Sequence, residues 1–544
     1  MSLNPFVTSL ISTQPVGVPR ASFGVPALLS YNATAFGADR TRFYASVDEV
    51  AADFPSLTGP EYLWATAVFS QADPVPERIA ILRGSSAPTM LYTGSVYALS
   101  PGETYVAKVR GDGVTTTDIE IPLPLTDVTY ASTDVTTGTD TVAAVAHGMT
   151  TGDGPYRVTT SGTLATGLAV DTNYWIIAPT AGTFKYASSY ANALAGTAVD
   201  LTAAGSGNTT LKRTANDVLV ALLVDRLNSV VGKNYTAAQV TGSGDTDTFT
   251  VTGSATGEWF SIEILPSQFV LALTHADPGV AADLTAIAAA GNGDGWYELH
   301  TAYNSTAYLT AAAAWIEAAS PPRTYQADTC NTLSWTNAGT TGNDIANVLH
   351  GLGYTRTQVN GHNRPAEFIG GAVAGRSLGL DPGSIARAHK ALVGVTPMTL
   401  TSTQVSNLIG TAAAPGKCAN GYFYVGGVGN FAPGRMASGE WWDVIRNDDS
   451  VNSDIEADLF DMVRQNQIVP YSDEGVALAE GVLRARLKQA KTAGIYQEPI
   501  RVTAVKAANV STTDRSRRKY TGLSWSAVRV GAMVFLTATG TVTT

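Results

Sequence analysis

The sequence predicts a multidomain α/β (α+β) protein with mixed-sheet domains, an inserted all-β module and an extended arm at each end. Three observations support this fold class. A strand–helix–helix–strand order stands near the N-terminus, a Thr/Gly-rich stretch without helical periodicity follows over residues 126–214, and alternating helices and strands return afterwards. A chain of 544 residues also exceeds what one hydrophobic core usually holds.

The first helices are predicted from residues 44–84. Ser46 and Glu49 form a capping-box pattern, so a short helix should begin there and end before Pro55. A second helix should begin at Pro60, because proline has no N–H to leave unsatisfied at a first helical position. The flanking apolar runs predict strands over residues 22–31 and 78–83, which we expect to pair in parallel.

The composition changes along the chain predict six segments. We expect an N-terminal extended arm at 1–20, a middle α/β domain at 21–118 and 215–320, an inserted peripheral all-β module at 119–214, a C-terminal core domain at 321–519, and a C-terminal β arm at 520–544.

Charge and composition exclude some partners. The net charge of −11 argues against direct nucleic-acid binding, which requires a basic surface. Charged residues make up 15% of the chain, against roughly 25% in typical soluble proteins, which suits either extensive subunit contact or a stable β-rich protein. Cys330 and Cys418 form no disulfide framework. We expect no leader peptide and no stable membrane insertion, because no apolar run approaches about 20 residues.

The motifs that carry chemistry are weak. The six histidines lack metal-pair spacing, and the G-x-G-x-x-A pattern at 427–432 is interrupted by Pro433, where a nucleotide-binding helix would have to begin. The acidic pairs Asp448–Asp449 and Asp473–Glu474 have no neighbouring residues typical of a sugar cleft. We therefore expect no catalytic residue, cofactor or metal, and no enzyme activity.

Both chain ends contain alternating apolar residues that are typical of strands. An added strand must satisfy its N–H and C=O groups at a sheet edge, either of a neighbouring copy or of its own subunit. The residues expected to make these contacts are Phe6, Val7 and Leu10 at the N-terminus and Val528, Val530, Met533 and Phe535 at the C-terminus.

The helix predicted over residues 475–491 places basic residues opposite an apolar stripe. This pattern fits a docking helix for an acidic partner, although a solvated basic face is the simpler interpretation. The basic residues are Arg484, Arg486, Lys488 and Lys491.

Separated motifs resemble the tail sheath proteins of contractile bacteriophages. They are FGVPALL at 23–29, R-x-Y-x-S-x-x-E-V-x-x-D-F at 42–54, GPEY at 59–62, and SGEWWDVIRNDD at 438–449. The resemblance covers most of the chain, apart from the β insert, which is similar to a module that recurs in phage tail proteins.

The resemblance implies a structural subunit that stacks as hexameric rings, helically, around a tail tube. Contraction would drive the tube through the host envelope, with the tail tube, baseplate and tail terminator proteins as partners. It also implies location in the virion tail, assembly in the host cytoplasm, strand exchange by the arms and tube contact by the helix at 475–491. The β insert would decorate the outside, stabilising the particle or contacting glycans. The alternatives are another tail or baseplate component, or a tail-associated glycan hydrolase.

Overall fold

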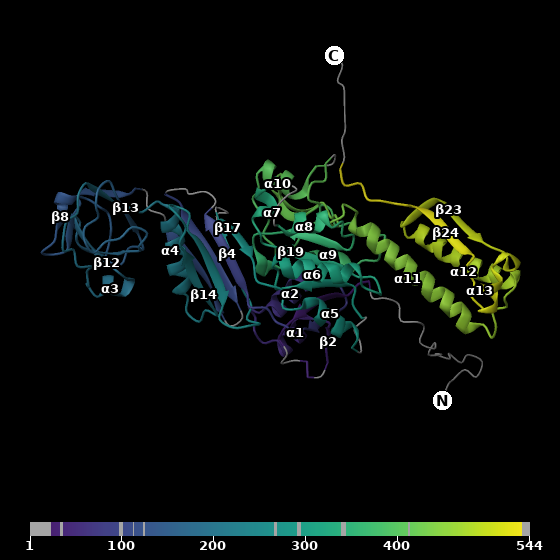
Figure 1. The fold of residues 1–544 in the computed structure, drawn as a ribbon. Coiled ribbons are helices and arrows are strands. Elements are labelled where there is room, and N and C mark those ends of the chain that lie inside the picture. The colour runs from purple at the N-terminus through teal and green to yellow at the C-terminus, as the bar shows by residue number, and fades with distance from the viewer. Residues whose placement is uncertain are drawn as a thin grey trace, which may run out of the picture.

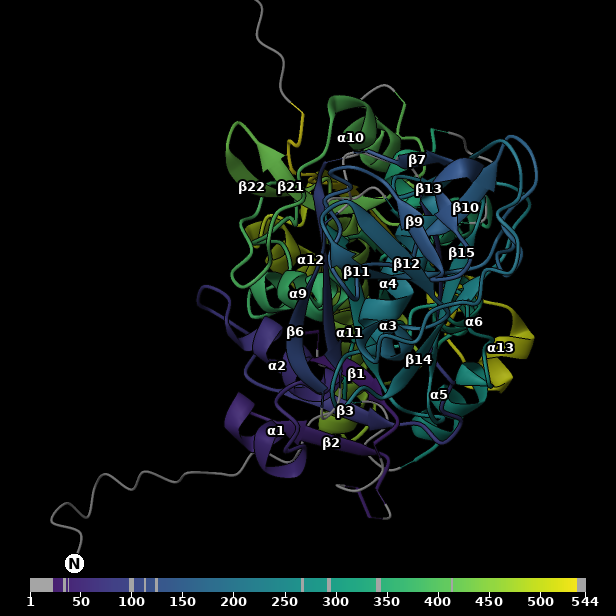
Figure 2. The same ribbon diagram turned by 90° about the vertical axis from the view of Figure 1, so that its left-hand side faces the viewer.

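The computed structural model describes residues 23–32, 36–37, 39–96, 102–111, 114–122, 126–265, 269–290, 295–338, 344–411 and 414–535. Four bodies follow one another in a row (Figure 1). We call them the β module, the middle domain, the central domain and the C-terminal lobe. Figure 2 looks along the row with the β module nearest the viewer. This mixed α/β architecture of several sheets and helices confirms the predicted fold class.

An eight-stranded sheet forms the central domain. Its six inner strands are parallel and each edge strand is antiparallel to its neighbour. Parallel pairing of β1 with β3 confirms the prediction from the first motifs. The strands lie in the order β2 (Thr41–Tyr44), β3 (Ile79–Arg83), β1 (Pro26–Ser30), β18 (Glu298–Thr301), β19 (Thr324–Thr329), β20 (Thr357–Gly361), β21 (Asn420–Val425) and β22 (Val428–Ala432).

This sheet crosses the domain boundary predicted at residue 320. β18 and β19 lie on opposite sides of that boundary but pair in parallel, with Glu298 opposite Thr324. The first strands of the chain join the same sheet. Residues assigned by sequence to two domains therefore share one core, because backbone hydrogen bonds run across all of their strands.

Helices cover both faces of the central sheet. One face is covered by α2 (Pro60–Phe69) and α9 (Ile369–Leu378), the other by α5 (Val280–Ala288), α6 (Thr306–Glu317) and α8 (Ile345–Gly351). The helix α1 (Val47–Asp53) packs on α2, while α7 (Leu333–Thr336) and α10 (Ser402–Ile409) pack together near β21.

The predicted helix starts are confirmed. The Ser46 hydroxyl accepts a hydrogen bond from the backbone N–H of Glu49 at 3.3 Å, and the Glu49 carboxylate accepts one from the backbone N–H of Ala45 at 2.7 Å. Pro60 occupies the first position of α2. These local contacts satisfy N–H groups that the helix itself leaves free.

The middle domain holds α4 (Asn216–Asn228) against two antiparallel sheets. One sheet has the order β14 (Tyr235–Val240), β15 (Thr248–Gly253), β4 (Leu91–Val96) and β17 (Phe269–Leu273). The other has the order β16 (Phe260–Leu265), β5 (Thr104–Gly111) and β6 (Val114–Pro122).

The β module lies between β6 and α4 in the chain. One of its sheets has the order β10 (Arg157–Thr160), β13 (Asn208–Lys212) and β7 (Val128–Ala131). The other has the order β11 (Trp175–Thr180), β12 (Thr183–Ala187), β9 (Thr141–Ala143) and β8 (Val135–Thr136), with the short helix α3 (Tyr190–Leu194) beside it.

A buried ionic cluster joins the β module to the middle domain. Arg157 on β10 donates to Asp217 on α4 at 3.0 Å and to Asp247, just before β15, at 2.5 Å. It also donates to Asn173 in the β module at 3.2 Å, and Asn173 donates to Gln239 on β14 at 2.8 Å. The three charged side chains are almost entirely buried, so this contact fixes the orientation of the module.

We expect Arg157→Ala to destabilise the junction by about 3–5 kcal/mol, because two carboxylates would remain buried without their cation. Limited proteolysis should then cut faster at the connections between the β module and the middle domain. The control is Lys212→Ala, which breaks a half-exposed pair with Asp127 and should cost about 1 kcal/mol or less. Equal sensitivity of the two variants would contradict a junction held by Arg157.

Candidate assembly interface in the C-terminal lobe

The C-terminal lobe is built on the second half of a long helix. This helix, α11 (Trp442–Gln465), begins inside the central domain and extends into the lobe, where it packs on α12 (Asp473–Thr492). The lobe also contains β23 (Tyr496–Ala504), α13 (Thr512–Ser516) and β24 (Leu523–Arg529).

The strands β23 and β24 form a two-stranded antiparallel sheet. One face packs on α12 around Leu483 and Leu487, and the opposite face is largely exposed. Within the described chain, each strand pairs with the other alone, so each has one edge without a strand partner. A two-stranded sheet is marginal by itself, and open edges readily accept further strands.

The predicted arm residues fall into three groups: one lies in a strand, three follow that strand, and three lie outside the described residues. Val528 lies in β24 opposite Gln497 of the same chain, so it follows the alternative of pairing within its own subunit. Val530, Met533 and Phe535 follow this strand as an extended segment, and Met533 is 82% exposed. Phe6, Val7 and Leu10 lie outside the described residues, as does the end of the predicted strand pattern beyond residue 535.

Three of the four predicted basic residues line one groove between α12 and β23. Its volume is about 490 Å³. Arg484 pairs with Glu480 at 2.6 Å, and Lys491 pairs with Glu498 at 2.8 Å. Within the described chain, Lys488 forms no ion pair. The groove is lined by Arg484, Lys488, Lys491, Thr492, Glu498, Ile500 and Val502.

Arg486 lies apart from this groove. It faces α11, where it pairs with Asp454 at 3.0 Å and Asp458 at 2.6 Å, and its side chain is 13% exposed. It therefore holds the two helices of the lobe together. Helical spacing alone could not indicate this role, because it depends on carboxylates 28 and 32 residues away.

Charge is strongly segregated along the chain. Residues 481–544 contain 11 of the 34 lysines and arginines but two of the 45 aspartates and glutamates, which gives this segment a net charge of +9. The preceding 480 residues carry −20. The chain as a whole is acidic, but its C-terminal end is basic. A basic end suits contact with an acidic surface.

Two adjacent carboxylates connect α11 to both bodies. Asp449 accepts two hydrogen bonds from Arg356 of the central domain, at 2.7 and 2.9 Å. Asp448 accepts from Tyr496 at 2.9 Å and pairs with Arg529, both in the C-terminal lobe. These two carboxylates, considered above for a sugar cleft, instead fix the helix at the junction.

The start of α11 is held by a buried ion pair under the central sheet. Arg387 donates from Nη2 to both carboxylate oxygens of Glu298 at 2.8 Å, from Nη1 to Gln358 at 2.6 Å, and from Nε to Ser377 at 3.1 Å. Its guanidinium lies 3.6 Å from the centroid of the Trp442 ring, and the Trp442 indole donates to Glu298 at 3.2 Å.

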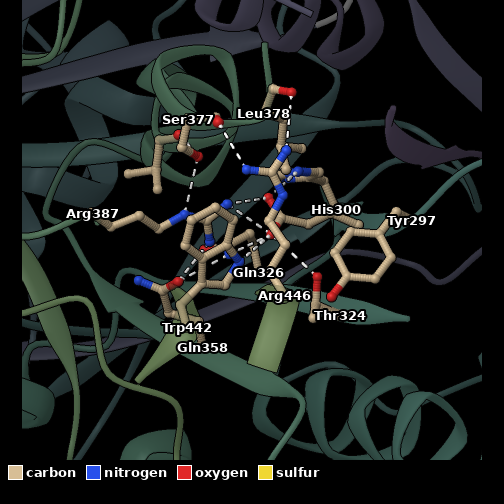
Figure 3. Close-up of polar contacts among 12 residues, drawn as sticks. Tyr297, His300, Thr324, Gln326, Gln358, Ser377, Leu378, Arg387, Trp442 and Arg446 are labelled. Carbon is tan, nitrogen blue, oxygen red and sulfur yellow. Dashed lines mark hydrogen bonds and ion pairs between the residues drawn. The ribbon is translucent and has the colours of Figure 1, made fainter. Parts of the chain in front are cut away.

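A second arginine reinforces this anchor. Figure 3 shows Arg387 and Arg446 converging beside the Trp442 ring. Arg446 donates to the carbonyls of Leu380 at 2.7 Å and Phe23 at 3.2 Å. It therefore ties the first described residues of the chain to the same helix.

The charge of Glu298 is stabilised by its partners. Burial alone would raise the pKa of this carboxyl group, but the Arg387 guanidinium and His300 lower it to about 2. The folded pKa thus lies below the unfolded value, so the carboxylate stabilises the fold fully above about pH 4.5 and loses this effect as the pH falls towards 2.

We expect Glu298→Gln to destabilise the central domain by about 3–5 kcal/mol at pH 7, because Arg387 would remain buried without a counter-ion. The variant should also lose the part of the acid sensitivity between about pH 4.5 and 2 that Glu298 contributes. Urea unfolding followed at several pH values measures both effects.

The control is Asp461→Asn, which breaks an exposed pair with Arg464 and should change stability by about 1 kcal/mol or less. An unchanged acid response in Glu298→Gln would contradict the assignment of that titration to Glu298.

The remaining motifs occupy structural positions. Residues 427–432 form the turn and second strand of the β21–β22 hairpin, with no helix following the glycines. Asp473 accepts a hydrogen bond from the backbone N–H of Ala507 at 2.9 Å. The described ranges contain no group of three potential metal ligands and no helix with the length and apolar character needed to cross a membrane.

No protein-family model and no curated protein matches the chain. Solved structures that resemble it include a sheath tail protein from Listeria innocua, at 9% identity and a TM-score of 0.38 over 94% of this chain and 96% of that chain. The contracted helical sheath of the anti-feeding prophage is 16% identical, with a TM-score of 0.36 over 48% and 74%. The contracted sheath complex of an extracellular contractile injection system, PVC, is 15% identical, with a TM-score of 0.33 over 45% and 70%.

Proposed function

We propose that the chain is a structural subunit of a contractile tail sheath, which assembles helically around a tail tube and contracts to drive the tube through the host envelope. The observation that carries this proposal is the β23–β24 sheet, which has one exposed face and, among the described residues, two edges without strand partners. The sequence motifs that resemble sheath proteins agree with it.

The open sheet provides a way to link copies. An extended segment from a neighbouring subunit can add to either edge, since its backbone groups complete the hydrogen bonding that the two strands leave unmet. The residues available for this are those before Phe23 and after Phe535. A contact between two different surfaces of the same chain does not close by itself, so repeated copies produce rings or a helix.

Such links allow the large contacts to change while copies remain connected. In the extended state the globular bodies meet in one arrangement, and in the contracted state in another of lower free energy. We infer stacked hexameric rings in the virion tail, assembled in the host cytoplasm, with baseplate and tail terminator proteins at the ends. The role is structural rather than enzymatic, which agrees with the use of the acidic pairs in hydrogen bonds and ion pairs.

The groove on α12 is the surface that we assign to the tube. Arg484, Lys488 and Lys491 line it, and they belong to the segment whose net charge is +9. An acidic tube surface would complement this charge. Arg486 is not part of the assignment, because its carboxylate partners lie within the subunit.

We expect full-length protein to form long striated tubes and a variant lacking residues 536–544 to lose them, because one linking segment is removed. Negative-stain electron microscopy of the two purified proteins tests this. The truncation leaves β24 intact, so the lobe should remain folded, and circular dichroism provides the control. Discrete particles from the full chain at all concentrations and salt conditions would contradict self-assembly and favour a baseplate component.

We expect the triple change Arg484→Gln, Lys488→Gln and Lys491→Gln to weaken binding to tail tubes by roughly tenfold or more at low salt, because three positive charges leave the contact. Co-sedimentation with purified tubes measures the loss.

The matched control is Arg515→Gln, Arg517→Gln and Arg518→Gln, which removes three exposed charges from the same lobe. Equal weakening by both sets would show general electrostatic attraction rather than a specific groove.

A further inference from the structure

The chain returns to the central domain after β24. The backbone N–H of Val530 donates to the carbonyl of Ile495 at 3.0 Å, which keeps the start of this segment in the lobe. Four residues later, a ring nitrogen of His389 lies 3.0 Å from the carbonyl oxygen of Val534. The Phe535 ring then lies 5.7 Å from the guanidinium of Arg435. We call residues 530–535 the C-terminal strap.

The surface under the strap is held by hydrogen bonds that do not involve the strap. The buried side chain of Asn420 accepts from the backbone N–H of Arg435 at 2.8 Å and donates to its carbonyl at 2.8 Å. The backbone N–H of His389 donates to Phe431 of the edge strand β22 at 2.7 Å. Both strap contacts are therefore made to residues whose backbone is held by the central sheet.

The buried guanidinium of Arg435 has nitrogen atoms that lack hydrogen-bond acceptors among the described residues. It is 7% exposed, and its guanidinium lies 4.8 Å from the Trp441 ring on one side and faces Phe535 on another. Its Nε and Nη1 atoms have no hydrogen-bond acceptor among the described residues. Buried arginine N–H groups without acceptors are costly, so this position calls for carbonyl or carboxylate oxygens.

We propose that Arg435, His389 and Trp441 form a receptor for the C-terminal end of their own chain. The Phe535 ring lies 5.7 Å from the Arg435 guanidinium, so the residues that continue the strap can bring backbone carbonyl oxygens to this group. The receptor binds the strap in cis, because Val530 and Phe535 are separated by four residues and both are held by the same subunit. Such a short tether gives a millimolar effective concentration.

This receptor defines where the C-terminal arm leaves the subunit. The pairing of the arm with a neighbouring subunit rests on the proposed function, whereas the contact within one subunit does not. Only residues 536–544 of the C-terminal arm then remain to pair with a neighbouring subunit. When extended, these residues span at most about 30 Å. A neighbour's sheet edge must therefore lie within about 30 Å of Phe535, next to β22 of the donor subunit.

The test combines a thiol-specific chemical cross-link with proteolysis of the full chain. We expect a short bis-maleimide, whose spacer covers the length of the replaced His389 ring, to cross-link the double variant His389→Cys/Val534→Cys within one chain, both in the dilute subunit and in assembled tubes, whereas either single variant should not be cross-linked. We also expect Phe535→Ala to increase tryptic cleavage after Arg529 about fivefold. The matched control Met533→Ala changes an exposed neighbouring side chain and should leave the cleavage rate unchanged.

The outcomes separate this inference from the proposed function. Cross-links between chains, no cross-link in either state, or equal effects of Phe535→Ala and Met533→Ala would overturn the cis receptor even if tubes form. A cis cross-link with faster cleavage of Phe535→Ala would support the receptor even if no tubes appear, and would leave the sheath proposal to fail alone. Thermal melting checks that each variant is folded.

Discussion

The ion pair between Glu298 and Arg387 is the contact on which the arrangement of the other bodies depends. It lies at the centre of the eight-stranded sheet and supports the Trp442 ring, where α11 begins. Since two buried charges require each other and several fixed hydrogen bonds, they tolerate little movement. The central domain therefore holds one end of α11 rigidly. The orientation of α11 in turn sets the orientation of the C-terminal lobe.

Polar contacts also hold two other junctions between bodies. Arg157 connects the β module to the middle domain, and the adjacent Asp448 and Asp449 connect the lobe to the central domain. Several of the few charges of this chain thus lie in internal joints. A sparsely charged exterior loses little solvation when copies pack together, which agrees with a protein made for repeated contact.

Local features could be predicted from the sequence, and distant pairings could not. Ser46 and Pro60 act within one helical turn, so their pattern identifies both helices. The pairing of β18 with β19, by contrast, joins strands across an apparent domain boundary and depends on the whole sheet. Helical spacing predicted the basic residues on α12. It could not predict that Arg486 is buried, because the carboxylates that bind Arg486 come from a different helix, α11.

The length of α11 gives the molecule a mechanical property. A helix of 24 residues extends for about 36 Å, and its first half is embedded in one body while its second half carries another. A tilt of about 10° at the buried end would therefore move the far end by about 6 Å, which exceeds the width of one strand in a sheet. The subunit thus acts as a lever, in which a small change of angle at the core becomes a large displacement at the surface that meets its surroundings.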